Sequence, residues 1–478
     1  MLTMVDNIVI ILFVAFVIYV GYYFSKSIKD MESFYLANRS LPWSLVVGTL
    51  VASWYGGVGV VGTVGYAAAF GFSSWAIWSV GAHLIRFPLA LWVGPKIHIR
   101  SDVTIPDFLD STYGKWVAIL GSIFLFIYCS QLGEITATGY IGQAAWGADK
   151  VVVGVVVVLL TILLTCLGGL MGVAVTDMIM FACMVCGVCL VFPKLFDTVG
   201  GLSGLEELLS ANKELLDPVA GMPMSKAIML LILCLNVYAD PSFYQRFSAS
   251  NSVKTGRRAM LTCFSLWVAF DVVIVLTGMI VRGLYPEAIP EVAYVSVILS
   301  ELPAGLRGMF IVGLMGAIIS TLDSYYLIGG TTLANDIYGR LLNKKLSDKT
   351  VVNLSRIGCC ILGLIGLLLA FKFTMVYDAI AFLMSLWMSA AFVPIVGGLM
   401  YKGKKTQAGG LMSMISGVLV FAYFKLNPIT ISETFGILEP IIIALPVSFI
   451  LWVIGNKIGK DKSELNKLDK EKNIIKSL

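Results

Sequence analysis

The sequence predicts an all-α integral membrane protein with about thirteen transmembrane helices, and three observations support this class. Of the 478 residues, 58% are hydrophobic and only 13% are charged, about half the ~25% charged share of soluble domains. The mean hydropathy is +0.89, more than a water-soluble core can accommodate. The apolar residues also fall into runs of roughly 18 to 25, and ~20 helical residues cross a bilayer core.

Short polar breaks separate these apolar runs. In chain order, the predicted spans are 7–24, 45–70, 73–95, 116–143, 151–169, 174–193, 227–243, 259–281, 307–333, 357–373, 376–400, 408–424 and 436–455. The first run follows Asp6, has no basic residue before it and has no small-residue cleavage site after it. We therefore expect a retained first helix rather than a signal peptide.

Lysine and arginine are concentrated in alternate loops. The cation-rich loops carry Lys26, Lys29 and Arg39; Lys96, Arg100 and Lys115; Arg246, Lys254, Arg257 and Arg258; Arg340, Lys344, Lys345 and Lys349; and Lys402, Lys404 and Lys405. Cytoplasmic loops carry the excess of positive residues in membrane proteins. We therefore expect a multi-pass protein of the plasma membrane, with its amino terminus outside and its lysine-rich tail in the cytoplasm.

The same composition argues against several functions. The net charge of +5 is mostly a topology signal, and we find no basic face with interleaved aromatics for binding nucleic acid. The nine cysteines lie mainly inside spans, and the chain has only two histidines, His83 and His98. No metal-ligand spacing and no pair of nucleophile and base emerges. An enzyme is therefore not expected, and a transporter or channel remains.

The second predicted span contains a glycine cluster. Gly56, Gly57, Gly59 and Gly62 lie in the middle of an apolar run, next to Ser53. Glycines at this spacing can simply allow two helices to pack closely. Adjacent glycines beside a serine and two aromatics also favour a local break, which frees backbone carbonyls for ions and solutes at mid-membrane.

The seventh span repeats this theme. Asn236, Asp240 and Pro241 lie near the end of a hydrophobic run, where proline kinks or ends a helix. Both breaks fall on the first helix of a five-helix unit, and an odd number of helices inserts the two units with opposite topology. The predicted divisions are 1–44, first helix and cytoplasmic loop; 45–195, first repeat; 196–226, extracellular loop; 227–400, second repeat; 401–455, two peripheral helices; and 456–478, cytoplasmic tail.

The ninth span carries oxygen-bearing side chains at helical spacing. One face of this span presents Ala317, Ser320, Thr321 and Ser324. A hard monovalent cation prefers such hydroxyl and carbonyl oxygens, although serines and threonines also bond their own helix. Asp323 in this stretch, and Asp177 at the start of the sixth span, are costly at membrane depth unless they pair or bind an ion.

These residues resemble the sodium/solute symporter family, whose members transport sugars, proline, sialic acid, pantothenate, monocarboxylates or choline with sodium. The resemblance covers nearly the whole chain. It rests on Ser33-Phe-Tyr-Leu-Ala-Asn-Arg-Ser40; Ile105-Pro-Asp-Phe-Leu109; Gly168-Gly-Leu170 followed by Thr176-Asp177; Tyr244-Gln-Arg246 followed by Ser248-Ala-Ser-Asn251; and Ala317-Ile-Ile-Ser-Thr321 followed by Asn335-Asp-Ile-Tyr338. Each motif alone is weak, but their order and spacing together are specific.

The resemblance implies one sodium site and a candidate second site, with sodium as the only metal. The first would use the carbonyls of Ala52, Tyr55 and Ala317 and the hydroxyls of Ser320 and Thr321. The second would use Asp177, Ser320, Asp323 and Ser324. The family has a hydroxyl at the third of these positions, and the aspartate here favours either a stronger ion site or a proton site. Packing of the helix interface is the alternative role for the hydroxyls of the first site.

The solute cavity is expected near the two breaks. Its candidate residues are Ser53, Trp54, Gly56, Gly57, His83, Arg86, Gln131, Glu134, Tyr238, Asp240, Tyr244 and Asp271. Glu134 is either a structural partner of Arg86 or the counter-charge of an organic cation, for which Trp54 would offer a cation–π face. The first break looks somewhat like that of choline-type members, and Ser53 replaces the asparagine of sugar-type members.

We therefore expect a sodium-coupled symporter that imports a small organic solute by alternating access. An amino acid, betaine or choline-like solute is preferred, and a sugar or a monocarboxylate anchored by Arg86 remains open. A ligand or sodium sensor, or a channel, on the same fold is the alternative from another class. The expected partners are the solute and the lipid bilayer; a monomer is expected, although the sequence does not determine the oligomeric state.

Overall fold

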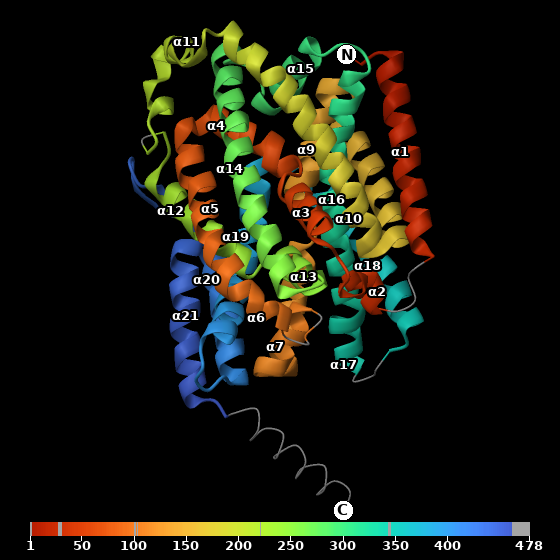
Figure 1. Ribbon diagram of the computed structural model, residues 1–478. Helices are drawn as coiled ribbons and strands as arrows, with labels where there is room; N and C mark the ends of the chain where they lie inside the picture. Colours follow the sequence, from red (N-terminus) through yellow and green to blue (C-terminus); the bar gives the residue numbers. More distant parts are fainter. Residues whose placement is uncertain are drawn as a thin grey trace, which may run out of the picture.

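The computed structural model describes residues 2–26, 31–99, 102, 104–219, 221–342 and 346–460. Figure 1 shows an almost entirely helical molecule. Its upper end carries α11 (Gly201–Leu208) and α15 (Pro290–Glu301), and its lower end carries α6 (Gly94–Ile99), α7 (Ile105–Tyr113) and α17 (Arg340–Leu342). The predicted cytoplasmic cations Lys29, Arg100, Lys344 and Lys345, and the tail beyond residue 460, lie outside the described residues.

In the described part of the chain, 11 helical stretches are long and apolar enough to cross a membrane. They are α1 (Met4–Ser25); Ser74–Ile99, comprising η3 (Ser74–Ser79), α5 (Val80–Pro88), η4 (Leu89–Val93) and α6; Lys115–Trp146, comprising α8 (Lys115–Tyr128) and α9 (Leu132–Trp146); Leu170–Thr198 of α10 (Lys150–Thr198); Met224–Ala249, comprising α12 (Met224–Cys234), η6 (Leu235–Tyr238) and α13 (Pro241–Ala249); α14 (Val253–Leu284); Leu306–Leu342, comprising α16 (Leu306–Thr331), η7 (Thr332–Gly339) and α17; Lys349–Ala370 of α18 (Asp348–Ala370); α19 (Val376–Met400); α20 (Gln407–Leu426); and α21 (Ile441–Ile458). A bent pair, α3 (Trp43–Trp54) with Val58–Phe70, and the shorter apolar helix Lys150–Cys166 complete the predicted set. The all-α membrane fold is therefore confirmed.

Short elements connect these spans. They are α2 (Met31–Leu36) and η1 (Ala37–Arg39) after α1, η5 (Ser210–Leu216) after α11, and the antiparallel strands β1 (Thr430–Ser432) and β2 (Gly436–Ile437) between α20 and α21.

Asp6 anchors α1 twice: it forms a capping box with Thr3, and its other oxygen accepts the N–H groups of Gly305 (2.7 Å) and Gly308 (3.1 Å) at the start of α16. The first helix is thereby fixed to the core.

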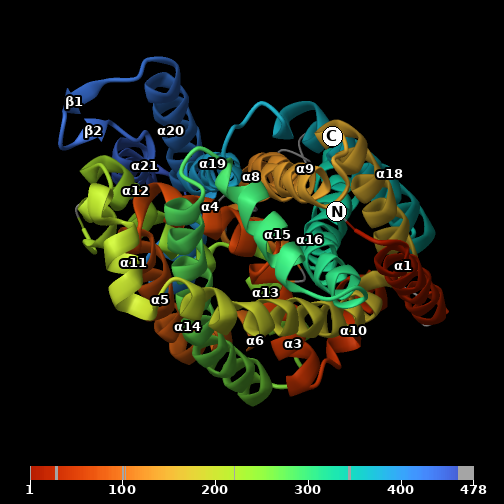
Figure 2. The ribbon, with the colours of Figure 1, turned by 90° about the horizontal axis from the view of Figure 1, so that it is seen from above.

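The core consists of two units of five helices with opposite topology. The first runs from α3 to α10 and the second from α12 to α19, while α1, α20 and α21 pack around them. The apolar window of the Leu306–Leu342 stretch is fully buried, and α16 packs against α10 along much of its length. Figure 2 shows α15 lying across the upper end of this bundle. The exact division limits remain predictions.

The first predicted break lies between α3 and the π-helical turn η2 (Val58–Gly62), which continues into α4 (Thr63–Phe70). The two halves are bent by 54°. A Cβ atom on Gly56 would lie 2.5 Å from both a carboxylate oxygen of Glu134 and the hydroxyl of Thr321, and one on Gly59 would clash with the carbonyl oxygen of Trp54. These two positions therefore require glycine because other groups approach the backbone closely.

The second predicted break separates α12 and α13. Asp240 caps α13, because its Oδ1 accepts the N–H groups of Ser242 (2.9 Å) and Phe243 (3.2 Å), and Pro241 occupies the first helical position. The two breaks thus begin the two units, as the sequence predicts.

We predict that Gly59→Ala lowers the melting temperature of the purified protein, because the clash with the Trp54 carbonyl costs about 1–3 kcal/mol, as overpacking does elsewhere. Gly62→Ala is the matched control, since its Cβ would lie 3.0 Å from a methyl group of Val376 that can move aside. Equal melting temperatures for the two variants would contradict the close approach at Gly59.

Candidate functional site

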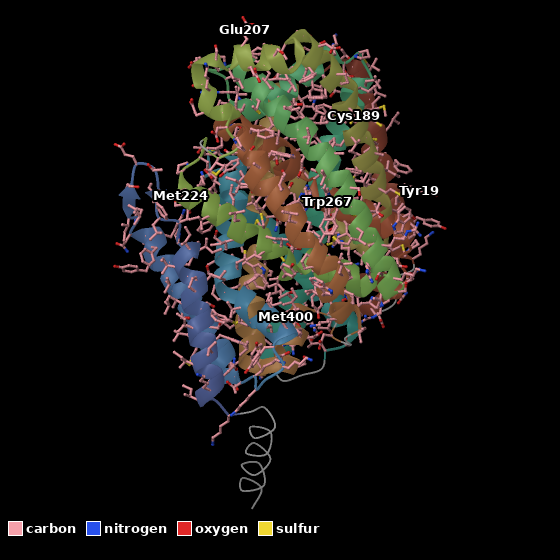
Figure 3. All side chains as sticks on the ribbon, turned by 60° about the vertical axis from the view of Figure 1, so that its left-hand side comes forward. Tyr19, Cys189, Glu207, Met224, Trp267 and Met400 are labelled. Atoms are coloured by element: carbon pink, nitrogen blue, oxygen red, sulfur yellow. The ribbon has the colours of Figure 1, made fainter. Side chains whose placement is uncertain are left out.

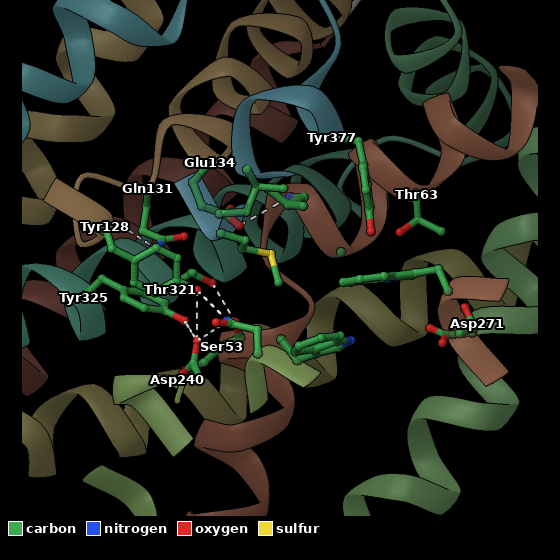
Figure 4. Close-up of a pocket in the computed structure, with 18 residues that line it drawn as sticks. Ser53, Thr63, Tyr128, Gln131, Glu134, Asp240, Asp271, Thr321, Tyr325 and Tyr377 are labelled. Atoms are coloured by element: carbon green, nitrogen blue, oxygen red, sulfur yellow. Dashed lines mark hydrogen bonds between the residues drawn. The ribbon is translucent and has the colours of Figure 1, made fainter. Parts of the chain in front are cut away.

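A small cavity lies between the two breaks, with a volume of about 70 Å³. This central cavity is lined by Ser53, Trp54, Val58, Gly59, Thr63, Trp78, Ser79, Tyr128, Gln131, Glu134, Asn236, Asp240, Asp271, Thr321, Tyr325, Tyr377, Ile380 and Met384. Figure 4 shows that these side chains come from both five-helix units. The cavity has room for several waters and is enclosed by aromatic rings and carboxylates.

Half of the predicted cavity residues line this space, namely Ser53, Trp54, Gln131, Glu134, Asp240 and Asp271. The other six do not line it. Gly56 and Gly57 contact the carboxylate of Glu134, and His83 and Arg86 follow Asp271 in a chain of bonds. Tyr238 donates to the Ile85 carbonyl (2.6 Å), and Tyr244 is buried outside the lining. Sequence reasoning missed Trp78, Tyr128, Tyr325 and Tyr377. Of these, Tyr325 could have been found, because it lies four residues after Thr321 on the same helix.

Two of the residues predicted for the first sodium site, Ala317 and Thr321, lie on α16 beside the end of α3. The hydroxyl of Thr321 donates to the carbonyl of Ala317 (3.0 Å) and reaches the carbonyl of Ser53 (3.4 Å). Ala52 and Tyr55 belong to the last turn of α3, whose final carbonyls lack partners within the helix. Ser320 Oγ is buried beside Asp177 without a hydrogen bond of normal geometry. The donor set is therefore one of hard oxygens, which suits sodium.

Glu134, on α9, binds the broken backbone of the first unit. One carboxylate oxygen accepts the N–H of Gly57 (2.6 Å) and the other approaches the N–H of Val58 (3.4 Å). These groups begin the helix after the break, where the helix dipole favours negative charge. Glu134 and Thr321 each lie 2.5 Å from the position of a Cβ on Gly56, so they are within about 5 Å of one another. The carboxylate therefore adjoins Thr321, one of the residues predicted for the first sodium site.

Asp240 is the second carboxylate of the cavity, and it bonds both the break of the second unit and side chains of α8 and α16. While Oδ1 caps α13, Oδ2 accepts the hydroxyls of Tyr128 (3.0 Å) and Tyr325 (2.8 Å) and the amide of Asn236 (3.4 Å). Figure 4 shows these groups clustered on one side of the cavity. The cluster joins α8, α13 and α16 through one buried charge.

Asp271, the third carboxylate, belongs to a chain of bonds that ends at Arg86. It accepts the Tyr55 hydroxyl (2.5 Å) and lies 3.0 Å from His83 Nε2. Arg86 lies 3.2 Å from His83 Nδ1, and because arginine only donates, Nδ1 accepts and Nε2 carries the hydrogen toward Asp271. Histidine is thereby fixed as one neutral tautomer.

Arg86 is sandwiched between two tryptophans rather than paired with Glu134. Its guanidinium lies 3.6 Å from the ring centre of Trp54 and 4.3 Å from that of Trp267, and the residue is fully buried. Of the two roles considered for Glu134, the pairing with Arg86 is therefore not formed, and Arg86 makes the His83 and tryptophan contacts instead. One cation–π face of Trp54 is already occupied by the protein itself.

The residues predicted for a second ion site are distributed around Arg246. Asp177 accepts the hydroxyl of Thr49 (2.5 Å), and Arg246 donates to Thr49 (3.1 Å), Ser53 (3.1 Å) and Ser324 (2.5 Å). Asp323 instead accepts the hydroxyl of Thr165 (2.5 Å). The sequence places Arg246 in a cation-rich cytoplasmic loop and in a motif, but the loop assignment is wrong, because the residue is fully buried between the core helices. Its guanidinium places a positive charge where a second cation is predicted. Arg246 bonds Ser324 and lies near Asp177, so it would compete with a second ion for these two side chains.

The upper side of the cavity is covered by α15 and its Glu291. This side chain is buried against Gly65 of α4 and accepts the backbone N–H of Val376 at the start of α19. Burial raises the pKa of the Glu291 carboxyl above its ordinary value, against the opposing effect of this hydrogen bond. Glu291 thus joins the cover to both units.

Comparisons with known proteins agree with this geometry. A model described as the sodium:solute symporter family matches residues 34–417. The osmoregulated proline transporter OpuE of Bacillus subtilis is 24% identical over 418 residues, covering 83% of this chain and 84% of the transporter. A sodium-coupled sialic acid symporter in a substrate-bound outward-open state superposes with a TM-score of 0.78 at 17% identity, covering 95% of this chain and 97% of the other. MHP1, a nucleobase-cation-symport-1 family transporter, superposes with a TM-score of 0.55 at 14% identity, covering 88% of this chain and 92% of the other.

We predict that Arg246→Gln destabilises the protein strongly, because it leaves Asp177 buried without its nearby positive charge, and breaking a buried charge pair costs about 3–5 kcal/mol. Adding Asp177→Asn should recover part of this loss. The measurement is the melting temperature of the two single variants and the double variant. A double variant less stable than Arg246→Gln alone would show that the two charges do not compensate each other.

Proposed function

The chain belongs to the sodium:solute symporter family, and we propose that it imports a small zwitterionic or cationic organic solute, such as an amino acid, a betaine or a choline-like compound. Sodium is the coupling ion, as the family and its sodium-coupled members indicate. The observation that carries the solute class is the position of Glu134 on the N–H groups of the first break.

Broken helices of transporters commonly use the positive end of the half-helix to bind an anionic group of the solute. In this chain the carboxylate of Glu134 already accepts the first N–H groups. None of the residues lining the central cavity is lysine or arginine, whereas three are carboxylates. Positive groups on the solute are therefore favoured, and the rings of Trp78 and Tyr377 provide further surfaces for an organic cation.

The alternatives have less support. A monocarboxylate anchored by Arg86 would have to displace the tryptophans that enclose its guanidinium. A sugar would need several neutral donors and acceptors, but Asp240 and Asp271 are engaged by tyrosine and histidine side chains. A sensor or channel on this fold remains distinguishable by experiment, because only a symporter accumulates solute against its gradient.

Sodium at the first site would stabilise one state of the transport cycle. Bound to Ala52, Tyr55, Ala317, Ser320 and Thr321, it would join the broken helix of the first unit to α16 of the second. Coupling arises because the ion binds this arrangement better than the alternative one, and the shift is no larger than that difference in affinity. A membrane potential adds ~2.3 kcal/mol per charge per 100 mV to sodium entry.

The proposal is tested by a thermal-shift screen of purified protein against amino acids, betaines, choline, sugars and monocarboxylates, each in sodium and in potassium chloride. We expect stabilisation by a zwitterion or cation only with sodium. Proteoliposome uptake of that compound, driven by an inward sodium gradient, then separates a symporter from a sensor. Stabilisation confined to sugars or monocarboxylates would refute the proposed solute class.

We predict that the double variant Ser320→Ala with Thr321→Ala loses sodium-dependent uptake and sodium-dependent stabilisation, because both hydroxyl ligands are removed. Correct insertion is checked by a single symmetric peak in size-exclusion chromatography. Ser416→Ala serves as the control, since this hydroxyl bonds the carbonyl of Ser413 on a peripheral helix (3.2 Å). Normal sodium dependence in the double variant would contradict the first sodium site.

We also predict that Glu134→Gln weakens binding of the solute by about 10- to 100-fold, because a hydrogen bond to a charged group contributes roughly 1.5–3 kcal/mol. Asp336→Asn is the matched control: it removes another buried carboxyl, which bonds Arg340 and Thr104 outside the central cavity. Affinity is measured by isothermal titration with the compound found in the screen. Equal affinities for Glu134→Gln and the unmodified protein would exclude the counter-charge role.

A further inference from the structure

A second cleft, of about 780 Å³, lies at the end of α19 where it faces α21. Its wall includes Met400, Tyr401, Lys404, Trp452, Asn456 and Lys457, which define the lower cleft here. Figure 3 shows Met400 in the lower part of the molecule, far from Glu207 at the upper end. None of the described residues lining the lower cleft is acidic. It is separate from the central cavity, and the symporter site does not use it.

The body of the lower cleft is apolar and rigidly held. The ring of Trp452 lies against Gly397, where an added Cβ would come within 2.7 Å of it, and its Nε1 donates to the Tyr113 hydroxyl (3.0 Å). Tyr401 contacts the same ring edge-on at 5.5 Å between centroids. Tyr401 and Phe449 are 50% and 54% exposed. A fixed apolar groove on the lipid-facing side of a membrane helix fits an acyl chain better than a soluble partner.

The rim of the lower cleft is basic. Lys404 and Lys457 line it and are exposed, and Lys96 lies nearby, with its Nζ 3.5 Å from the sulfur of Met400. Basic pockets between membrane helices bind the headgroups of anionic lipids. Long lysine stems also keep their charge at the interface while their methylenes cover apolar surface.

Asn456 adds a buried polar group without a partner. It is 7% exposed, and its Oδ1 accepts the backbone N–H of Thr406 (2.7 Å), which fixes the orientation of the amide. Its Nδ2 is buried and forms no hydrogen bond with the described residues, and Asn456 is part of the wall of the cleft. A buried amide that keeps a donor unpaired costs free energy, and an ester or phosphate oxygen of a ligand would satisfy it.

We propose that the lower cleft is a binding site for an anionic phospholipid. An acyl chain lies along Trp452 and Phe449, the phosphate lies between Lys404 and Lys457, and Asn456 Nδ2 donates to an ester or phosphate oxygen. The proposal is independent of the transported solute. It assigns to α21 the role of completing a lipid site with α19.

The test is native mass spectrometry of the delipidated protein, titrated with equal amounts of phosphatidylglycerol and phosphatidylcholine that carry the same acyl chains. We expect the unmodified protein to retain phosphatidylglycerol preferentially. Lys404→Gln with Lys457→Gln should reduce this preference by about 30-fold, or about fivefold for each lysine. Val396→Trp, which fills the groove and keeps both lysines, should abolish retention of the lipid.

Lys402→Gln with Lys460→Gln is the matched control, because it removes the same charge from exposed positions that do not line the cleft. If the preference for phosphatidylglycerol falls equally in this control, the effect comes from general surface charge, and the proposal is overturned. Equal retention of the two lipids by the unmodified protein would also overturn it. Retention of glycerol 3-phosphate as strong as that of phosphatidylglycerol would overturn the lipid site in favour of a site for a soluble phosphate.

Discussion

The structure depends on one constraint: two helices are broken inside the membrane, and their freed backbone groups have no water to bond. Each unsatisfied group would cost several kcal/mol in hydrocarbon. The first break is satisfied by Glu134 on the N–H side and by Thr321 on the carbonyl side, and the second by Asp240. The carbonyls that these side chains leave over at the end of α3 are the ones that we propose for sodium. The proposed site would therefore be a direct consequence of how the breaks are satisfied.

The two buried arginines of the core follow the same logic, because each reaches groups of the opposite five-helix unit. Arg246 of the second unit bonds Thr49 and Ser53 of the first, next to Asp177. Arg86 of the first unit reaches Asp271 of the second through His83. Such pairs are costly to separate. In the alternating-access cycle that we propose, a movement of one unit against the other would exchange these bonds for others, so they would hold the transporter in one state until ion or solute binding offsets the loss.

Local patterns in the sequence predict the helices, both breaks and the hydroxyl face of α16, since glycine, proline and serine report on their own backbone. The partners across the site could not be predicted this way. Glu134 lies 77 positions from Gly57, and Arg246 lies 78 from Ser324, so only the folded chain brings them together. The pairing of Arg86 with Glu134, one of two alternatives in the sequence, is not formed, because charge sign alone ignores the tryptophans beside Arg86 and the N–H groups beside Glu134.

The closeness of Glu134 to Thr321 bears on the choice between a zwitterion and a simple cation. The Thr321 hydroxyl lies within about 5 Å of the Glu134 carboxylate. Sodium bound at Thr321 would therefore lie near this carboxylate and would offset much of its negative charge. A simple cation would then compete with sodium for one carboxylate, and the two would oppose each other's binding. A zwitterion places its own carboxylate toward sodium and its positive group toward Glu134, so each ligand strengthens the other. Positive coupling between ion and solute, which symport requires, therefore favours the zwitterion.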